Sequence, residues 1–229
     1  MLEQNRQIAY CRGMRSTILF DLDGTLLDTS PGIFTTANFT MRELGFKEQN
    51  STQLRKFVGP PLAACFRVAC GLEESLIPKA CEVYRTEYTR SGALYHAHIY
   101  DGIPELLDTL IDRGMTLGVA TLKYESLAQQ ILAHFDLERR FSVISGADHL
   151  GTLSKADIIV EALERLGQKD RSNVLMVGDT PHDMDGAVDA GVSFVGVDWG
   201  FGFSRGHRVE PTPMVLGMID EPQGLLDYL

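Results

Sequence analysis

Two aspartates follow the first apolar run of the chain at a spacing suited to shared chemistry. The run Thr17–Phe20 is followed by Asp21, Leu22, Asp23 and Gly24. Residues i and i+2 of an extended chain point to the same side, so Asp21 and Asp23 are predicted to aim at one point, and Gly24 permits the turn that exposes them. Two carboxylates this close resist joint ionisation unless a cation or a shared proton relieves the repulsion. The pattern therefore favours a reactive site over a polar turn that merely ends a strand.

Two later positions add groups that suit an anionic ligand. Thr121 ends a second apolar run and offers a hydroxyl beside a backbone N–H, although an ordinary strand-capping threonine has the same appearance. Lys155 opens a helical pattern, where the positive end of the helix dipole disfavours a cation. An anion is therefore expected to compensate Lys155.

The fourth apolar run brings two more acids. Its end, Gly178-Asp179, is followed four residues later by Asp183. If Asp21, Asp23, Asp179 and Asp183 converge at neighbouring strand ends, their repulsion requires a hard cation, and oxygen ligands with retained waters favour Mg²⁺. A solvated acidic rim is the alternative, and it weighs more for Asp183 than for Asp179.

Strand-like and helical patterns alternate along most of the chain. The strand-like runs are 17–21, 115–121, 141–145, 173–179 and 192–197. Between them, 103–113 and 155–166 have the apolar stripes and terminal glycines of helices. This alternation predicts an α/β fold, a parallel sheet covered by helices on both faces.

The segment after the first aspartates breaks the alternation. Between about residues 30 and 92 there is no convincing strand, and four helical patterns appear, the first with Ser30 as its expected cap. We predict an inserted helical cap over 30–95, an α/β core formed by 16–29 and 96–229, and a loose leader over 1–15. Two short crossings would then hinge the cap over the strand ends, where open α/β sheets bind ligands.

Composition narrows the class of protein. The chain has 229 residues, 44% of them hydrophobic, with a net charge of −10 and a pI near 5.0. The negative charge argues against a nucleic-acid or anionic-membrane surface, and no apolar run is long enough to span a membrane. Four cysteines lack Cys-x-x-Cys spacing, which favours reduced thiols and a cytoplasmic location: Cys11, Cys65, Cys70 and Cys81.

Taken together, the motifs resemble those of a known superfamily. The motifs are Asp21-Leu22-Asp23-Gly24-Thr25, Thr121, Lys155, and Gly178-Asp179 with Asp183. Their order and spacing are similar to the four signature motifs of the haloacid dehalogenase-like hydrolases, and the similarity covers nearly all of the chain from Ser16 onward. The segment 57–62, Phe-Val-Gly-Pro-Pro-Leu, is similar to the phosphoglycolate phosphatase-like and nucleotidase-like branches. The resemblance implies a Rossmann-like core with a helical cap.

The resemblance also implies a role for each motif residue. Asp21 would be the nucleophile that attacks phosphorus and forms an aspartyl-phosphate. Asp23 would protonate the leaving oxygen and then deprotonate the attacking water. Thr121 and Lys155 would bind the phosphoryl oxygens and offset their charge.

The implied cofactor is Mg²⁺. It would be held by Asp21, the backbone carbonyl of Asp23 and Asp179, while Asp183 would order a water ligand. The N–H of Leu122, beside the second-motif threonine, would be a further donor to substrate. Leu122 is bulkier than the small or polar residue that the resemblance leads us to expect.

Substrate choice is expected to come from the cap. The candidates for substrate binding are the loop around Gly59, which two prolines stiffen, and the nearby basic residues Arg55 and Arg67. Alternatively, the two arginines lie on solvated helix faces. A small phosphorylated metabolite is the expected partner of a monomer or homodimer.

The sequence predicts a Mg²⁺-dependent phosphatase of small phosphomonoesters, phosphoglycolate phosphatase-like. A 5′-nucleotidase-like phosphatase and a sugar-phosphate mutase are alternatives with the same acids. A receiver-like phosphorylation module is the alternative outside enzymes, but receivers are shorter and lack a helical cap. An idle binding protein is a further alternative.

Overall fold

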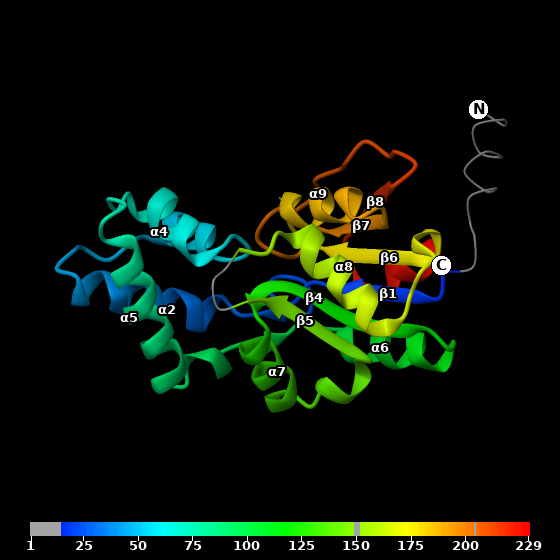
Figure 1. Cartoon of the computed structure of the whole chain (residues 1–229), viewed down its shortest axis with the longest axis horizontal. Helices are drawn as coiled ribbons and strands as arrows, with labels where there is room; N and C mark the ends of the chain where they lie inside the picture. The colour runs from blue at the N-terminus through cyan, green and yellow to red at the C-terminus, as the bar shows by residue number, and fades with distance from the viewer. Residues whose placement is uncertain (1–14, 149–151, 204) are drawn as a thin grey trace.

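The core of the protein is a six-stranded sheet in which every pairing is parallel (Figure 1). A computed structural model of the chain describes residues 15–148, 152–203 and 205–229. The first strand in the sequence lies inside the sheet rather than at its edge, and the predicted α/β class is confirmed. In spatial order the strands are β5 (Val143–Ala147), β4 (Thr116–Tyr124), β1 (Thr17–Phe20), β6 (Val174–Gly178), β7 (Ser193–Val197) and β8 (Val215–Ile219).

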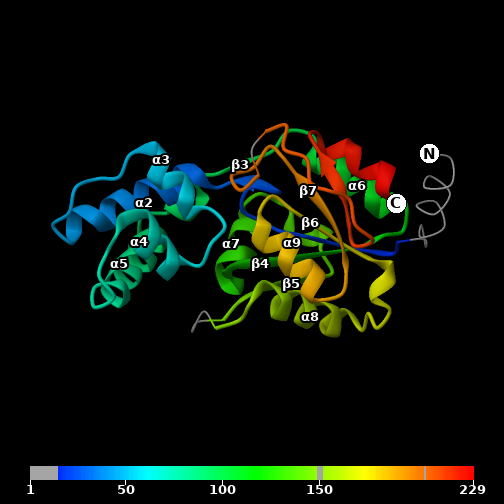
Figure 2. The same ribbon diagram turned by 90° about the horizontal axis from the view of Figure 1, so that it is seen from above.

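Alternate side chains of the central strands enter two different apolar clusters. In β1, Ile18 and Phe20 belong to one cluster and Leu19 to the other, because successive side chains of a strand point to opposite faces. Helices cover both faces, as predicted, and Figure 2 shows α6 and α8 on opposite sides of the sheet. The first cluster includes side chains of α6 (Ile103–Asp112), α7 (Glu125–His134) and η5 (Pro222–Tyr228), and the second includes those of α8 (Lys155–Leu166) and α9 (Pro181–Asp189).

Local signals explain where the core helices begin and end. The Ser154 hydroxyl accepts a hydrogen bond from the Asp157 N–H at 3.1 Å, and the Asp157 carboxylate accepts one from the Ser154 N–H at 2.9 Å. This capping box starts α8, and Gly167, at φ 68°, ends it, so the helix has the predicted bounds. Helix α6 ends at Asp112, one residue before the predicted end.

The sheet differs from the prediction at its edges. Strand β8 was not predicted, because Gly217 interrupts an already short run and lowers its strand propensity. Strand β4 continues to Tyr124 through an irregularity after Thr121 instead of ending at Thr121. Strand β5 is displaced two residues from its predicted range. Two short turns, η3 (Glu138–Arg140) and η4 (Arg171–Asn173), lead into β5 and β6.

The inserted helical cap lies beside one end of the sheet (Figures 1 and 2). Its entry and exit are held together by a small antiparallel pair of β2 (Leu27–Asp28) and β3 (His98–Ile99). This pair was not predicted, because two-residue strands leave no periodic signal. The cap comprises α2 (Ser30–Glu43), α3 (Ser51–Leu54), η1 (Arg55–Phe57), α4 (Leu62–Cys70), α5 (Ile77–Arg90) and η2 (Ala93–Tyr95).

The start of α2 corrects one expectation. Ser30 is the first residue of the helix rather than its cap, and its N–H donates to the Asp28 carboxylate at 2.9 Å. Thr29 occupies the cap position without a side-chain capping bond. Its hydroxyl donates instead to the Asp23 carboxylate at 2.5 Å. The hydroxyl of Thr29, which precedes α2, therefore binds Asp23 of the first motif instead of an N–H group of the helix.

The chain start and the thiols complete the fold. The predicted leader lies outside the described residues except for Arg15, and so does Cys11. Arg15 is not loose, because its buried guanidinium donates to the carbonyl of Tyr228 at 2.9 Å. No helix in the described part of the chain has the length and apolar character needed to cross a bilayer. The cysteines of the cap are free thiols: Cys65, Cys70 and Cys81.

Candidate active site

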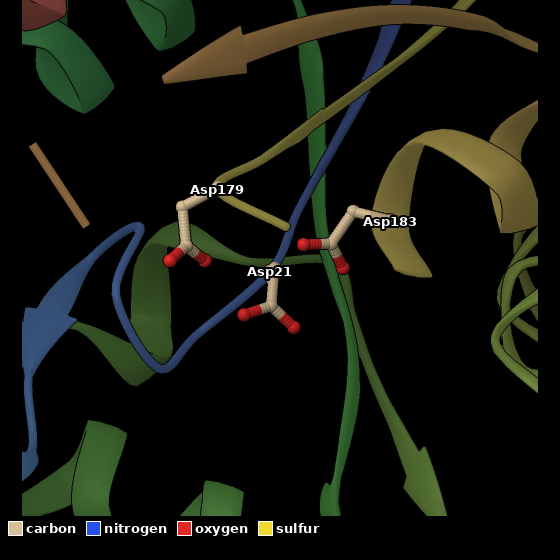
Figure 3. Close-up of side chains that lie close together, drawn as sticks. All are labelled: Asp21, Asp179 and Asp183. Carbon is tan, nitrogen blue, oxygen red and sulfur yellow. The ribbon is translucent and has the colours of Figure 1, made fainter. Parts of the chain in front are cut away.

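Three carboxylates converge where β1 and β6 end, as Figure 3 shows. Strands β1 and β6 are parallel neighbours with Phe20 opposite Val177, so the residues that follow them emerge side by side. Asp21 and Asp179 come from these strand ends, and Asp183 comes from the first turn of α9. One oxygen of each lies within 4.8 Å of the others, and all three residues are buried.

Lys155 supplies positive charge to this cluster. Its Nζ lies 2.6 Å from Asp21 Oδ1 and 2.6 Å from Asp183 Oδ1, and its side chain is only 4% exposed. The anion expected near the start of α8 is therefore this pair of carboxylates. Gly186 of α9 permits the approach, because a Cβ there would lie 2.6 Å from the Lys155 side chain.

The electrostatics of the cluster favour an added cation. Burial raises the pKa of Asp21 and Asp179, and neighbouring carboxylates raise both further. Burial alone would lower the pKa of Lys155, but Asp183 and Asp21 outweigh it and raise that pKa. One ammonium group cannot offset three buried carboxylates. A donor set made only of carboxylate oxygens fits a hard cation such as Mg²⁺.

A glycine-rich loop fixes the Asp179 carboxylate. Its Oδ2 accepts hydrogen bonds from the N–H groups of Phe201 at 2.7 Å and Gly202 at 3.2 Å. Gly200 is required for this approach, since a Cβ there would lie 2.3 Å from the same oxygen. The sequence analysis gave this loop no role. Its two glycines beside an aromatic residue were the available signal.

Asp23 faces a different environment from Asp21. Its Oδ1 accepts from Thr29, and its Oδ2 lies 2.9 Å from the Nζ of Lys123. Asp23 is not one of the three carboxylates of the cluster, but its charge contributes to the raised pKa of Asp21, and the expectation that both carboxylates aim at one point stays a prediction. Gly24, at φ 90°, turns the chain after Asp23. The predicted metal contact of Asp23, made through its backbone carbonyl, stays a prediction.

Lys123 was missed by the sequence analysis. It lies near the end of β4, two residues after Thr121, and its side chain is 9% exposed. Burial lowers the pKa of Lys123, but the Asp23 carboxylate outweighs burial and raises it. Thr121 is itself buried, and its hydroxyl oxygen accepts from the Lys123 N–H at 3.3 Å, which leaves the hydroxyl hydrogen for another acceptor. A lysine at the end of an apolar strand was the only sequence signal.

The structure separates the predicted substrate-binding residues. Leu122 and Gly59 line one cavity of about 170 Å³ between cap and core. Arg55 does not line it, because its guanidinium stacks 5.3 Å from the ring centroid of Phe201. Arg67 lies on the exposed face of α4 in an ion pair with Glu74, outside the cavity lining. Its position gives no support to the prediction that it binds substrate.

Fold and site together define a capped α/β hydrolase with an acidic centre, and comparisons with known proteins identify its family. The model of the haloacid dehalogenase-like hydrolases matches residues 18–197. The chain belongs to the haloacid dehalogenase-like hydrolase family. The predicted resemblance and the predicted hydrolase class are confirmed.

Individual relatives come from several bacteria. A 5′-nucleotidase of Pseudomonas aeruginosa is 41% identical over 81% of this chain and 83% of its own length. The tyrosine-protein kinase PtkA of Mycobacterium tuberculosis is 39% identical over 81% of this chain but 62% of its own. A phosphoglycolate phosphatase of Aquifex aeolicus is 31% identical over 80% and 85%. The first and third of these names support the predicted nucleotidase-like and phosphatase-like branches, whereas the second is the name of a kinase.

A solved structure supports the fold independently. A predicted phosphatase from Clostridium acetobutylicum superposes with a TM-score of 0.78 and 34% identity. The match covers 84% of this chain and 89% of the other. The fold of this chain is therefore also found in a solved structure.

Proposed function

We propose that the protein hydrolyses a small phosphomonoester with Mg²⁺ through an aspartyl-phosphate on Asp21. The observation that carries this proposal is the buried cluster in which Asp21 lies against Lys155 and beside Asp179 and Asp183. A carboxylate held by a lysine next to a hard-cation site has the surroundings that phosphoryl transfer requires. The names of the relatives support the same reaction class.

In the first half-reaction, an Asp21 oxygen attacks phosphorus and the bond to the leaving oxygen breaks. Lys155 and the Thr121 hydroxyl hold phosphoryl oxygens and offset the charge they gain. Asp23 delivers a proton to the leaving oxygen. Its position at the cavity, outside the metal cluster, suits this role, since the leaving group departs toward the cap.

In the second half-reaction, a water molecule attacks the phosphorus of the aspartyl-phosphate and Asp23 takes its proton. The Asp21 carboxylate is restored and inorganic phosphate leaves. Asp21, Asp179 and Asp183 would hold Mg²⁺, with the Asp23 carbonyl as the further predicted contact. The bound ion would neutralise the carboxylates and draw charge from the phosphoryl oxygens.

The experiment measures inorganic phosphate released from a panel of phosphomonoesters with Mg²⁺, with and without a chelator. We expect turnover that the chelator removes and that Asp21→Asn abolishes. Phosphate released by Asp21→Asn at the wild-type rate would refute the nucleophile. Isomerised product without free phosphate would identify the sugar-phosphate mutase instead, and a long-lived phosphorylated form without turnover would identify a receiver-like module.

Phosphoglycolate was the first predicted substrate and a nucleoside 5′-monophosphate the alternative. The 41% identity to a 5′-nucleotidase favours including nucleotides in the panel. A monomeric or homodimeric state and a cytoplasmic location stay predictions.

A further inference from the structure

The cavity between cap and core begins at the residue that would protonate the leaving group. Asp23 forms part of its lining, together with Leu122 and Lys123 of β4 and residues of α4 and α5. The Asp23 carboxylate has to lie within hydrogen-bond reach of the leaving oxygen, so the remainder of the leaving group extends into this cavity. Its lining therefore bears on which alcohol the enzyme releases.

The lining is mostly apolar, and both modules contribute to it. Leu62 at the start of α4 and Leu122 on β4 are each partly buried and line the same cavity. Other apolar contributors are Ile33, Phe57, Tyr84, Tyr88, Tyr124, Leu127 and Leu153. Surfaces of this kind are stabilised by contact with apolar or aromatic groups, whereas a carboxylate loses its hydration there without recompense.

The aromatic part of this lining is held in place by ring contacts. The ring centroids of Phe57 and Phe66 lie 5.2 Å apart, and those of Phe66 and Tyr84 lie 6.1 Å apart, with both pairs packed edge-on. Tyr84 stacks on Tyr88 with a centroid distance of 5.4 Å and an interplanar angle of 22°. Three of these rings, Phe57, Tyr84 and Tyr88, belong to the cavity lining. A ligand ring thus meets a preorganised surface rather than one that must be ordered on binding.

The cations of the lining are already engaged. Among the described residues that line the cavity, these are Lys123 and Arg85. Lys123 is paired with Asp23 at 2.9 Å, and Arg85, which is exposed, stacks 4.7 Å from the ring centroid of Tyr124. A carboxylate two carbons from the phosphate would therefore lie near Asp23, where the charge of Lys123 is already offset.

We propose that the leaving group of the physiological substrate carries a flat apolar ring, clamped between Leu62 of the cap and Leu122 of the core. The enzyme accordingly prefers ring-bearing phosphomonoesters to small phosphorylated carboxylic acids. This inference rests on the proposed phosphatase function and makes Leu62 and Leu122 specificity-determining residues. The ring is either attached directly to the phosphate oxygen or separated from it by a sugar.

The test compares kcat/KM for phenyl phosphate, the four common nucleoside 5′-monophosphates and 2-phosphoglycolate. For wild type we expect at least one ring-bearing substrate to exceed 2-phosphoglycolate by about tenfold or more. A preference for phenyl phosphate places the ring next to the phosphate, and a preference for a nucleotide places it beyond a sugar. If 2-phosphoglycolate is the better substrate, the inference is wrong while the proposed phosphatase function stands. If no phosphomonoester is hydrolysed, the proposed function itself fails.

Two variants locate the effect. Leu122→Asn and Leu62→Asn place a polar group on either side of the cavity, and each should lower kcat/KM for the preferred ring-bearing substrate by about tenfold, mainly through KM. The inhibition constant of inorganic phosphate should change little, because phosphate does not fill the cavity. Val68→Asn is the matched control on α4, since Val68 is 68% exposed and does not line the cavity. An equal loss for 2-phosphoglycolate and for the ring-bearing substrate in both cavity variants would overturn the proposal.

Discussion

The two sides of the active centre are built from opposite kinds of interaction. The core side is a buried set of charges in which Asp21, Asp179 and Asp183 share Lys155. The side that faces the cap is an apolar cavity between cap and core, with aromatic walls, in which the core residues Lys123 and Asp23 neutralise one another. In the proposed reaction, the buried charges act on phosphorus, while the cavity distinguishes one alcohol from another.

The two sides also differ in how tightly their parts are held. Asp179 is fixed by two backbone N–H donors and Asp183 by the capping box of α9. The cap meets the core through stacking and van der Waals contacts, such as the stacking of Arg55 on Phe201 and the approach of Gly59 to Thr180. Charges must be positioned within a fraction of an ångström to catalyse a reaction, whereas apolar surfaces tolerate small displacements.

The largest expected effect tests the chemical role of the core. Asp21→Asn removes the proposed nucleophile while keeping the size of the side chain, so kcat should fall by about 10⁴-fold or more. Folding should be preserved, since the change removes one of several buried carboxylates. Phosphate release and thermal unfolding measure the two outcomes. If Asp21→Asn keeps a tenth or more of the wild-type activity, Asp21 is not the nucleophile.

The next effect tests whether the core is an electrostatic assembly. Lys155→Met leaves Asp21 and Asp183 without their ammonium partner, and we expect the free energy of unfolding to fall by about 3–5 kcal/mol, together with loss of activity. Lys79→Met is the control, because the Lys79–Glu82 pair is exposed and should contribute less than about 1 kcal/mol. Denaturant titration measures both. Similar losses in the two variants would contradict the special status of the buried cluster.

The dependence of thermal stability on Mg²⁺ and pH tests the buried charges of the core. The pKa values of Asp21 and Asp179 are raised by burial in the folded chain, so the metal-free folded chain binds protons that the unfolded chain has released. The contribution of these groups to stability is therefore present at low pH and is lost as the pH rises through their folded pKa values. With a chelator, Tm should fall between about pH 6 and about pH 9 by about 4 °C or more, and Mg²⁺ should raise Tm most at the higher pH. An equal Mg²⁺ effect at both values would contradict this assignment.

The smallest effect concerns the contact between the two sides. Arg55→Met removes the cation–π contact with Phe201, an interaction of about 0.5–1 kcal/mol, so KM should rise about two- to fivefold with little change in kcat. Arg67→Met is the matched control, since Arg67 pairs with Glu74 on the outer face of the cap. Steady-state kinetics on one substrate compare the two. A larger effect at Arg67 would show that the cap recognises substrate from its outer face.

Sequence reasoning succeeded where the signal was local. Helix α8 was predicted with its observed ends because Gly167 and the helical pattern mark them within a few residues. The strands that carry Asp21 and Asp179 were identified because buried strands of a parallel sheet are continuous apolar runs. The convergence of their acids followed from topology alone.

The remaining features depend on contacts between distant segments. Lys123 is distinguished by its pairing with Asp23, which is 100 residues earlier in the chain, and no local pattern records that pair. Likewise, the outer position of Arg67 depends on how α4 is rotated within the cap. The Asp23 carboxylate lies outside the acidic cluster and contacts Thr29 and Lys123, and no local pattern records these contacts.

The pairing of β2 with β3 makes the covalent connection between cap and core narrow. The chain leaves the core and returns to it through strands that are hydrogen-bonded to one another, so about seventy residues are enclosed by a junction only one strand spacing wide. Because the two chain ends at this junction are adjacent, a different enclosed segment would not require the central sheet to change. A different cap could therefore be inserted between β2 and β3, which would change the compounds that the enzyme accepts while the core stays the same.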